Sequence, residues 1–181
     1  MVSKSLTCLP IETARLRIRC FRPGDLEPFV RFMTDQGSTR FLPFDQEQRS
    51  PEGAKKLLET TMASYHTEEP MPAMAVEERA TGAFVGFCGL SPRNEETMEV
   101  LYAVMPEARR KGCATEIASA LAEYALNRLG FLRVVAFIVP ANEPSKVVAA
   151  RAGFVDGGLV KNRNFKGLVH RFILDRETAP G

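Results

Sequence analysis

Apolar and polar positions follow two different periods along the chain, and each change of period predicts a new element. Residues 15–20 alternate arginine with Leu, Ile and Cys, a period of two that predicts a strand with one apolar face. The arginines are interpreted as a solvated outer face. Residues 23–37 open with Pro and Asp, carry apolar residues at helical spacing and end at a glycine, so they predict a helix. A second helix is expected to begin at Ser50.

The middle of the chain predicts a hairpin, a strand and a long helix. Residues 73–76 and 83–90 flank a turn at Gly82, and the second of these strands is apolar on both faces, which is typical of a central strand. A further strand begins at Glu99. After a turn, apolar residues at helical spacing continue as far as Gly130, where the helix is expected to end.

The last third of the chain predicts a strand, a helix and a closing hairpin. Residues 133–139 are a continuous apolar strand. Asn142 is a candidate helix N-cap, with Val147 and Val148 facing inward. The closing hairpin is expected to pair residues 154–160 with residues 167–174.

Composition limits the interpretation. A chain of 181 residues that is 45% hydrophobic predicts one α/β domain over 1–181, with a lead-in at 1–13 and a tail at 176–181. A net charge of +2, from 24 basic and 22 acidic residues, indicates neither a nucleic-acid nor a membrane partner. No signal-like or membrane-spanning apolar stretch occurs, so a cytoplasmic protein is expected. Four dispersed cysteines and two histidines disfavour a metal site, and the cysteines are interpreted as reduced and mostly buried.

A basic corner between the strand at Glu99 and the long helix carries the candidate chemistry. Free N–H groups and the positive end of the helix dipole favour an anion at a helix start. Gly112 and Ala114 let a phosphate approach the backbone closely, and three neighbouring cations attract it. Neither a Walker loop nor a dinucleotide fingerprint fits this order of residues. The corner comprises Arg109, Arg110, Lys111, Gly112, Cys113, Ala114 and Thr115.

The corner resembles the acyl-CoA signature of the GNAT superfamily of N-acyltransferases, Arg/Gln-x-x-Gly-x-Gly/Ala. Residues 142–154 resemble the family's second signature, Asn-x-x-Ser-x-x-Val-x-x-Lys/Arg-x-Gly-Phe. Residues 12–19 are similar to the Glu-Thr-Glu-Arg-Leu-x-Leu-Arg opening of the branch that contains the ribosomal-protein alanine N-acetyltransferases. The strand and turn at 99–116 resemble the same branch. The matches keep the family's order and spacing over most of the chain.

This resemblance implies a mixed, mostly antiparallel sheet flanked by helices and a transfer of acetyl from acetyl-CoA to an amine. Two neighbouring strands would splay and hold the pantetheine arm, with backbone groups near Val104 bonding it and stabilising the oxyanion. Glu99 is a candidate general base, and the alternative is a surface glutamate or a strand-end ion pair. Ser145 is read either as a helix-start residue or as a hydroxyl that helps protonate the leaving thiolate. The implied cofactor residues are Val104, the seven corner residues, Asn142 and Ser145; the candidate acceptor residues, for which core packing is the alternative, are Arg40, Phe41 and Phe44.

Other features leave alternatives open. Many relatives carry a tyrosine beyond the second signature as general acid, whereas this chain has Asn164 and Phe165 there. A catalytically inactive acyl-CoA-binding module is therefore kept as the second hypothesis. Cys113, a thiol among cations, is interpreted as a tolerated buried residue rather than a reactive one. The acceptor is a protein N-terminal amine, a lysine or a small-molecule amine, and a homodimer is compatible with the resemblance.

Overall fold

Residues 10–179 are described by a computed structural model, and within them eight strands form one sheet in the order β1-β2-β3-β4-β5-β6-β8-β7. The sheet is mostly antiparallel, and β5 and β6 are a parallel pair. The strands are β1 (Ile11–Glu12), β2 (Leu16–Arg19), β3 (Ala73–Glu78), β4 (Phe84–Pro92), β5 (Thr97–Val104), β6 (Arg133–Ile138), β7 (Val155–Lys161) and β8 (Leu168–Asp175). The α-helices are α1 (Leu26–Thr34), α2 (Gln36–Thr39), α3 (Pro51–Ser64), α4 (Cys113–Glu123) and α5 (Glu143–Arg151). The mixed α/β class and the mostly antiparallel sheet are confirmed.

The chain divides into two compact units, called here the first and the second unit. The first holds residues 10–88 and 103–111 of the described range, and the second holds residues 89–102 and 112–179. The predicted single domain over 1–181 stays a prediction, and β1 lies inside its expected lead-in. Cys8 falls outside the described residues.

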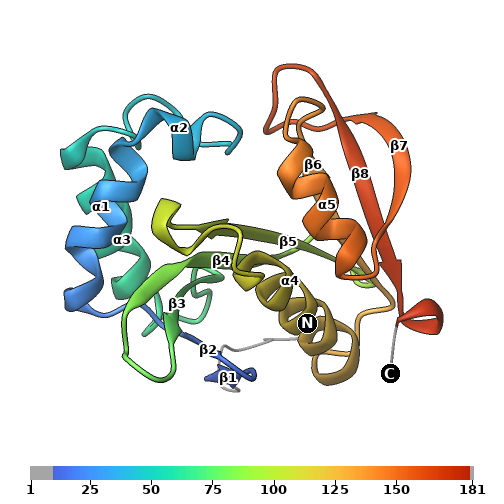
Figure 1. The fold of residues 1–181 in the computed structure, drawn as a ribbon, viewed down its shortest axis with the longest axis horizontal. Helices are drawn as coiled ribbons and strands as arrows, with labels where there is room; N and C mark the ends of the chain where they lie inside the picture. The colour runs from blue at the N-terminus through green and yellow to red at the C-terminus, as the bar shows by residue number, and fades with distance from the viewer. Residues whose placement is uncertain (1–9, 180–181) are drawn as a thin grey trace. The chain divides into compact units, whose positions relative to one another are not determined.

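Helices α1 and α3 of the first unit pack side by side, as Figure 1 shows. Ser50 caps α3 as predicted, because its hydroxyl accepts a hydrogen bond from the Gly53 N–H at 3.0 Å. The predicted end of α1 at Gly37 is wrong. The helix ends at Thr34, since Asp35 turns extended and caps a new short helix, α2, by accepting a bond from the Ser38 N–H; Gly37 lies inside α2.

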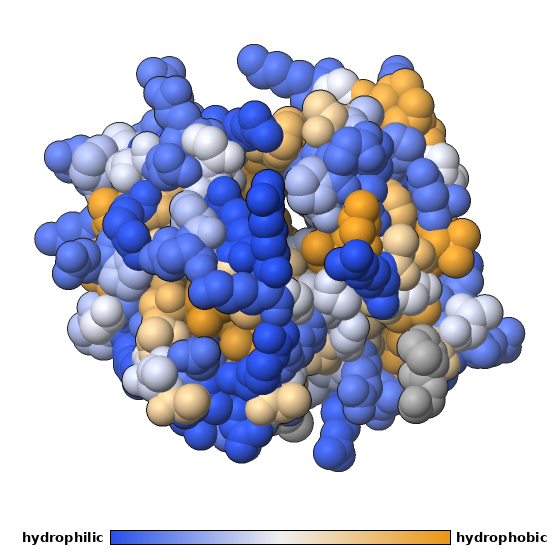
Figure 2. Space-filling view, viewed as in Figure 1, coloured by the Kyte–Doolittle hydropathy of each residue, from blue (hydrophilic) through white to orange (hydrophobic). Residues whose placement is uncertain are grey.

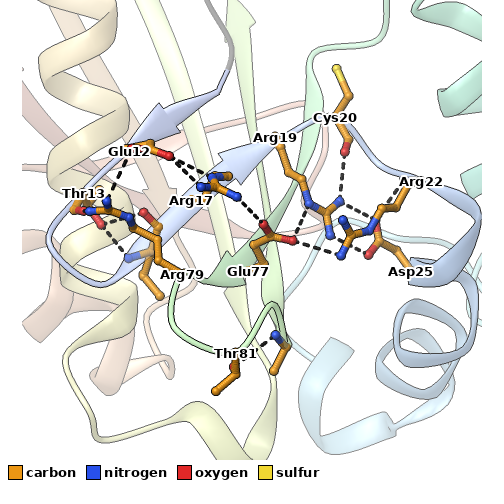
Figure 3. A network of polar contacts seen from close by, with 12 residues as sticks. Glu12, Thr13, Arg17, Arg19, Cys20, Arg22, Asp25, Glu77, Arg79 and Thr81 are labelled. Atoms are coloured by element: carbon orange, nitrogen blue, oxygen red, sulfur yellow. Dashed lines mark hydrogen bonds and ion pairs between the residues drawn. The ribbon is translucent and has the colours of Figure 1, made fainter.

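The arginines of β2 are not the simple solvated face that the alternation predicts. Figure 3 shows them around Glu77 of β3, whose side chain is only 4% exposed. Glu77 contacts Arg19 at 2.6 Å, Arg22 at 3.1 Å and Arg17 at 3.2 Å, and Arg19 also contacts Asp25 at 2.7 Å. A carboxylate this deeply buried requires such pairing, so the outward face of β2 is an ion-pair network.

In the second unit, α4 packs on α5, and α5 contacts β6 and β7 (Figure 1). The predicted long helix is confirmed in extent, but after Glu123 it widens into a π-helical turn (Tyr124–Arg128) before Gly130. The inward orientation predicted for Val147 is wrong. Its side chain is exposed while Ala149 is buried, and Figure 2 shows apolar surface where Figure 1 draws α5, β7 and β8.

Residues 10–179 contain neither a membrane-spanning helix nor a cluster of metal ligands. No helix there is both long and apolar enough to cross a bilayer. No group of three or more His, Cys, Asp or Glu side chains in the same residues is arranged to hold a metal ion.

Candidate active site

Strands β5 and β6 part from one another in the second unit. Their parallel register pairs Thr97 with Arg133, Met98 with Val134 and Glu99 with Val135, and it stops there. Both strands continue, β5 to Val104 and β6 to Ile138. Backbone groups of parted strands are available to an extended ligand, as they are at a sheet edge. The register thus contains the splay that the family resemblance implies.

Glu99 lies at the position where the two strands part. Its side chain is 15% exposed, and one carboxylate oxygen lies 3.1 Å from a guanidinium nitrogen of Arg93. Burial raises the pKa of Glu99, and the positive charges of Arg93 and Arg163 only partly oppose the shift. The ion pair of the alternative interpretation is therefore present. The same carboxylate has the raised proton affinity that suits a general base.

Tyr102, on the same strand, contacts the start of α5. Its hydroxyl oxygen lies 3.2 Å from Oγ of Ser145 and 3.3 Å from the Ser145 carbonyl oxygen. Asn142 caps α5 as predicted, accepting a bond from the Ser145 N–H at 3.4 Å. Burial raises the pKa of Tyr102, with the bond to Ser145 acting in the opposite sense. Both structural and chemical roles remain available to Ser145.

Sequence reasoning missed Tyr102 because its partner is 43 residues away. The alternation of side chains along β5 could have shown that Tyr102 lies on a different sheet face from Glu99. Along β5, Glu99 and Tyr102 are an odd number of residues apart, so they point to opposite faces of the sheet. The tyrosine face is the one that α5 covers.

The corner before α4 is built by two residues with positive φ, Arg110 at 59° and Gly112 at 79°. Gly112 is the N-cap and has no side chain to offer the helix, so the first N–H groups of α4 lack a capping side chain. Cys113 is buried at 8% exposure, in line with its interpretation as a packing residue. Ala114 and Thr115 complete the first turn.

The three cations of the corner differ in their contacts. Arg109 donates to the Val104 carbonyl at 3.1 Å and to Oγ of Ser38 at 2.6 Å. It therefore connects the end of β5 to α2 within the first unit. The Lys111 carbonyl accepts a bond from Arg15 at 2.8 Å. The side chains of Arg110 and Lys111 are exposed.

The candidate acceptor residues lie after α2 in the first unit. The guanidinium of Arg40 stacks over the Phe41 ring at 4.4 Å. The Phe44 ring packs at 6.2 Å on Phe87, which is a core residue at 3% exposure. Core packing therefore accounts for Phe44 at least in part, and Arg40 and Phe41 form a partly exposed pair.

Comparison with known proteins identifies the class. Residues 15–155 match the acetyltransferase (GNAT) domain family, and the chain belongs to that family. It is 26% identical over 153 residues to YoaA, an uncharacterized N-acetyltransferase of Bacillus subtilis, covering 83% of this chain and 85% of that one. It is an acetyltransferase of the GNAT type.

Two solved structures share the fold. One is a putative ribosomal-protein-serine acetyltransferase of Vibrio cholerae, with a TM-score of 0.77, 22% identity and coverage of 93% of this chain and 98% of that one. The other is spermidine N-acetyltransferase of Vibrio cholerae in complex with CoA and spermine, with a TM-score of 0.75, 17% identity and coverage of 92% and 98%. Both structures show that the GNAT fold extends over nearly the whole of this chain.

Proposed function

We propose that the protein transfers the acetyl group of acetyl-CoA to a primary amine, by direct attack of the amine on the thioester in a ternary complex. The observation that carries the proposal is the parting of β5 and β6 immediately after Glu99. A thioester arm bonded to parted strands would lie next to a buried carboxylate. Proximity and a fixed orientation supply much of the rate in such a complex.

The acyl donor is assigned to the corner and to the start of α5. The exposed cations Arg110 and Lys111 and the uncapped first turn of α4 suit the phosphates of CoA. Arg109 contributes by holding the turn, given its bonds to Val104 and Ser38. The full set proposed for the donor is Val104, Arg109, Arg110, Lys111, Gly112, Cys113, Ala114, Thr115, Asn142 and Ser145.

Glu99 is proposed to accept the proton that the amine must lose. An ammonium group cannot attack, and reference pKa values of about 7.7–8.0 for an α-amine and about 10.4 for lysine set the size of this demand. The neutral amine attacks the thioester carbon, backbone N–H groups near Val104 stabilise the oxyanion, and the C–S bond then breaks. Glu99 takes the amine proton directly or through water.

Tyr102 and Ser145 are proposed to return a proton to the departing thiolate. Burial keeps the phenol protonated at neutral pH by raising its pKa, and the 3.2 Å contact gives the proton a path to Ser145 Oγ. This pair would fill the role of the tyrosine expected beyond the second signature, where this chain has Asn164 and Phe165.

The acceptor is proposed to be a protein N-terminal amine or a small-molecule amine. Two neighbours of the same fold are named for a ribosomal protein and for spermidine, which supports both classes. Arg40, Phe41 and Phe44 are proposed as acceptor contacts. The homodimer stays a prediction that sedimentation velocity can test.

The test is a thiol-release assay with acetyl-CoA against N-terminal peptides, lysine peptides and small amines, with mass spectrometry of the products. We expect one class to gain a single acetyl group, with intersecting lines in double-reciprocal plots because both substrates bind before release. Acetyl-CoA binding without turnover on any amine would favour the alternative, an inactive acyl-CoA-binding module.

A further inference from the structure

Three arginines of the second unit belong to the sheet face or the loop near Glu99: Arg93, Arg163 and Arg171. Arg93 contacts Glu99 at 3.1 Å, and its guanidinium carbon lies 5.5 Å from the centre of the Phe137 ring. Burial dominates the pKa of Glu99, but the charges of Arg93 and Arg163 act on it as well. Arg163, in the loop between β7 and β8, is thus close enough to Glu99 to interact electrostatically.

Arg171 on β8 is the third arginine. Its Cα is the cross-strand partner of Phe137, and the next pair on the same face, Val135 with Ile173, is level with Glu99. Directly paired residues share a sheet face, so Arg171 lies on the Glu99 face, beside the segment where β5 and β6 have parted. Its Nε is buried and has no hydrogen-bond partner within residues 10–179.

Asn162, in the same loop as Arg163, holds a second buried donor of this kind. The residue is 7% exposed, and its Oδ1 accepts a bond from the Asn164 N–H at 2.9 Å. That bond fixes the amide orientation and leaves Nδ2 as a donor, and Nδ2 has no acceptor in the described part of the chain.

Both unsatisfied atoms on this hairpin are donors, and a buried donor left without an acceptor destabilises the fold. Arg93 and Arg163 act on the carboxylate of Glu99, and Arg171 lies on the same sheet face, so positive charge exceeds negative charge among these residues. Such a set attracts an oxygen anion and repels a polycation. The donor cluster, meaning Arg93, Arg163, Arg171 and Asn162, is therefore incomplete without an anionic acceptor of hydrogen bonds.

We propose that the donor cluster binds a carboxylate carried by the acceptor, so that the amine acetylated by this enzyme belongs to an amino acid or to a protein N-terminus with an acidic residue beside it. The inference rests on the proposed function. It assigns Arg171 and Asn162 to acceptor selection and Arg93 to both selection and the orientation of Glu99. A polyamine such as spermine, which carries only positive charge, is a poor acceptor under this assignment.

The test compares acceptors that differ only in the carboxylate. One pair is an Ala-Asp peptide and its Ala-Asn counterpart, and a second pair is a free amino acid and its amide, compared at equal concentrations of neutral amine. We expect kcat/KM to favour the carboxylate member of at least one pair by about tenfold or more, the size of one charge-assisted hydrogen bond. The pair that shows it identifies the source of the carboxylate.

Variants assign the preference to the cluster. Arg171→Gln is expected to reduce the preference to about twofold, mainly by raising the KM of the carboxylate acceptor. Arg128→Gln, an exposed arginine at the end of the π-helical turn after α4, is the matched control and should keep the preference. If Arg171→Gln does not fold, Asn162→Asp is used instead; its added negative charge should reverse the preference.

Three results would overturn the inference while leaving the acetyltransferase assignment intact. They are equal acetylation of both members of each pair, a preference for spermine, and a carboxylate preference that is unchanged in Arg171→Gln or, where that variant does not fold, in Asn162→Asp. Binding of acetyl-CoA without acetylation of any amine would overturn both.

Discussion

The hydroxyl of Tyr102 on β5 lies 3.2 Å from Oγ of Ser145 on α5, within the second unit. This contact connects β5, which precedes the basic corner, to α5, which carries the second signature. It gives Ser145 a partner with a proton to donate. It also offers a replacement for the tyrosine that many relatives carry farther along the chain.

Tyr102→Phe tests the proton path. Loss of the hydroxyl is expected to lower kcat about 100-fold, near the lower end of what general acids contribute, with little change in the KM for acetyl-CoA. Steady-state kinetics with a fixed acceptor measure both quantities. An acyl donor with a better leaving group, such as an aryl thioester, should recover part of the loss, because its thiolate can depart without being protonated.

Tyr65→Phe is the matched control. Its hydroxyl donates to the Ala73 carbonyl at 2.6 Å and accepts from the Phe21 N–H at 3.2 Å in the first unit. The variant should lose about 1–2 kcal/mol of stability but keep its kcat. Equal kcat in Tyr102→Phe and the wild type would remove Tyr102 from the mechanism.

Glu99→Gln should separate activity from stability. Burial raises the folded-state pKa of Glu99, so the folded protein favours the protonated carboxyl. The stability that this protonated form contributes is complete below the unfolded pKa and is lost as pH rises through the folded pKa. At pH 7 the ionised carboxylate therefore destabilises the fold. The variant should melt at or above the wild-type temperature at pH 7, and this difference should shrink near about pH 4.

The activity of Glu99→Gln should fall across the whole pH range. For the wild type, kcat/KM should rise with pH as Glu99 ionises, at a pH above the ordinary carboxyl range, and the variant should lack this rise. Glu96→Gln, an exposed neighbour, is the control and should keep the wild-type profile. An unchanged profile in Glu99→Gln would leave Glu99 with the ion pair to Arg93 alone.

Gly112→Ala tests the corner. Gly112 has a φ of 79°, and an alanine held in the left-handed region costs about 1–2 kcal/mol. Gly82 has a φ of 71° with open space around an added Cβ, so Gly82→Ala carries the same strain in a hairpin turn. Both variants should melt a few degrees lower, but only Gly112→Ala should weaken acetyl-CoA binding in calorimetric titration. Equal affinities in the two variants would argue against phosphate binding at the corner.

Glu77→Gln tests the ion-pair network of Figure 3. Burial opposes ionisation of Glu77, but Arg19, Arg22 and Arg17 outweigh it and hold its pKa below the ordinary value. Its contribution is therefore present above the unfolded pKa and lost as pH falls through the folded pKa. The variant should lose about 3 kcal/mol at pH 7 and less at acidic pH, whereas exposed Glu78→Gln should change little. Denaturant unfolding at several pH values measures the difference.

Local signals in the sequence predicted local structure well. Ser50 and Asn142 cap their helices through contacts three residues away, and such contacts need only the residues nearby. The β3–β4 hairpin and the central position of β4 followed from turn residues and from apolar faces. Each of these depends on short-range geometry.

Long-range contacts were beyond the same reasoning. The partner of Tyr102 lies 43 residues away, and Glu77, the shared partner of Arg17 and Arg19, lies 60 and 58 residues from them. The exposure of Val147 depends on which side of α5 meets the sheet, and the helix's weak apolar pattern did not fix that. The unsatisfied donors of Arg171 and Asn162 are visible only once the hairpin is folded.

The most direct test of the central claim is mass spectrometry of an amine acceptor after incubation with the protein and acetyl-CoA, with free CoA measured in the same sample. The account predicts one acetyl group added per acceptor amine, one CoA released for each, and much slower formation of both products in Tyr102→Phe and Glu99→Gln. Release of CoA without an acetylated amine, or no release in a sample that binds acetyl-CoA, would contradict it.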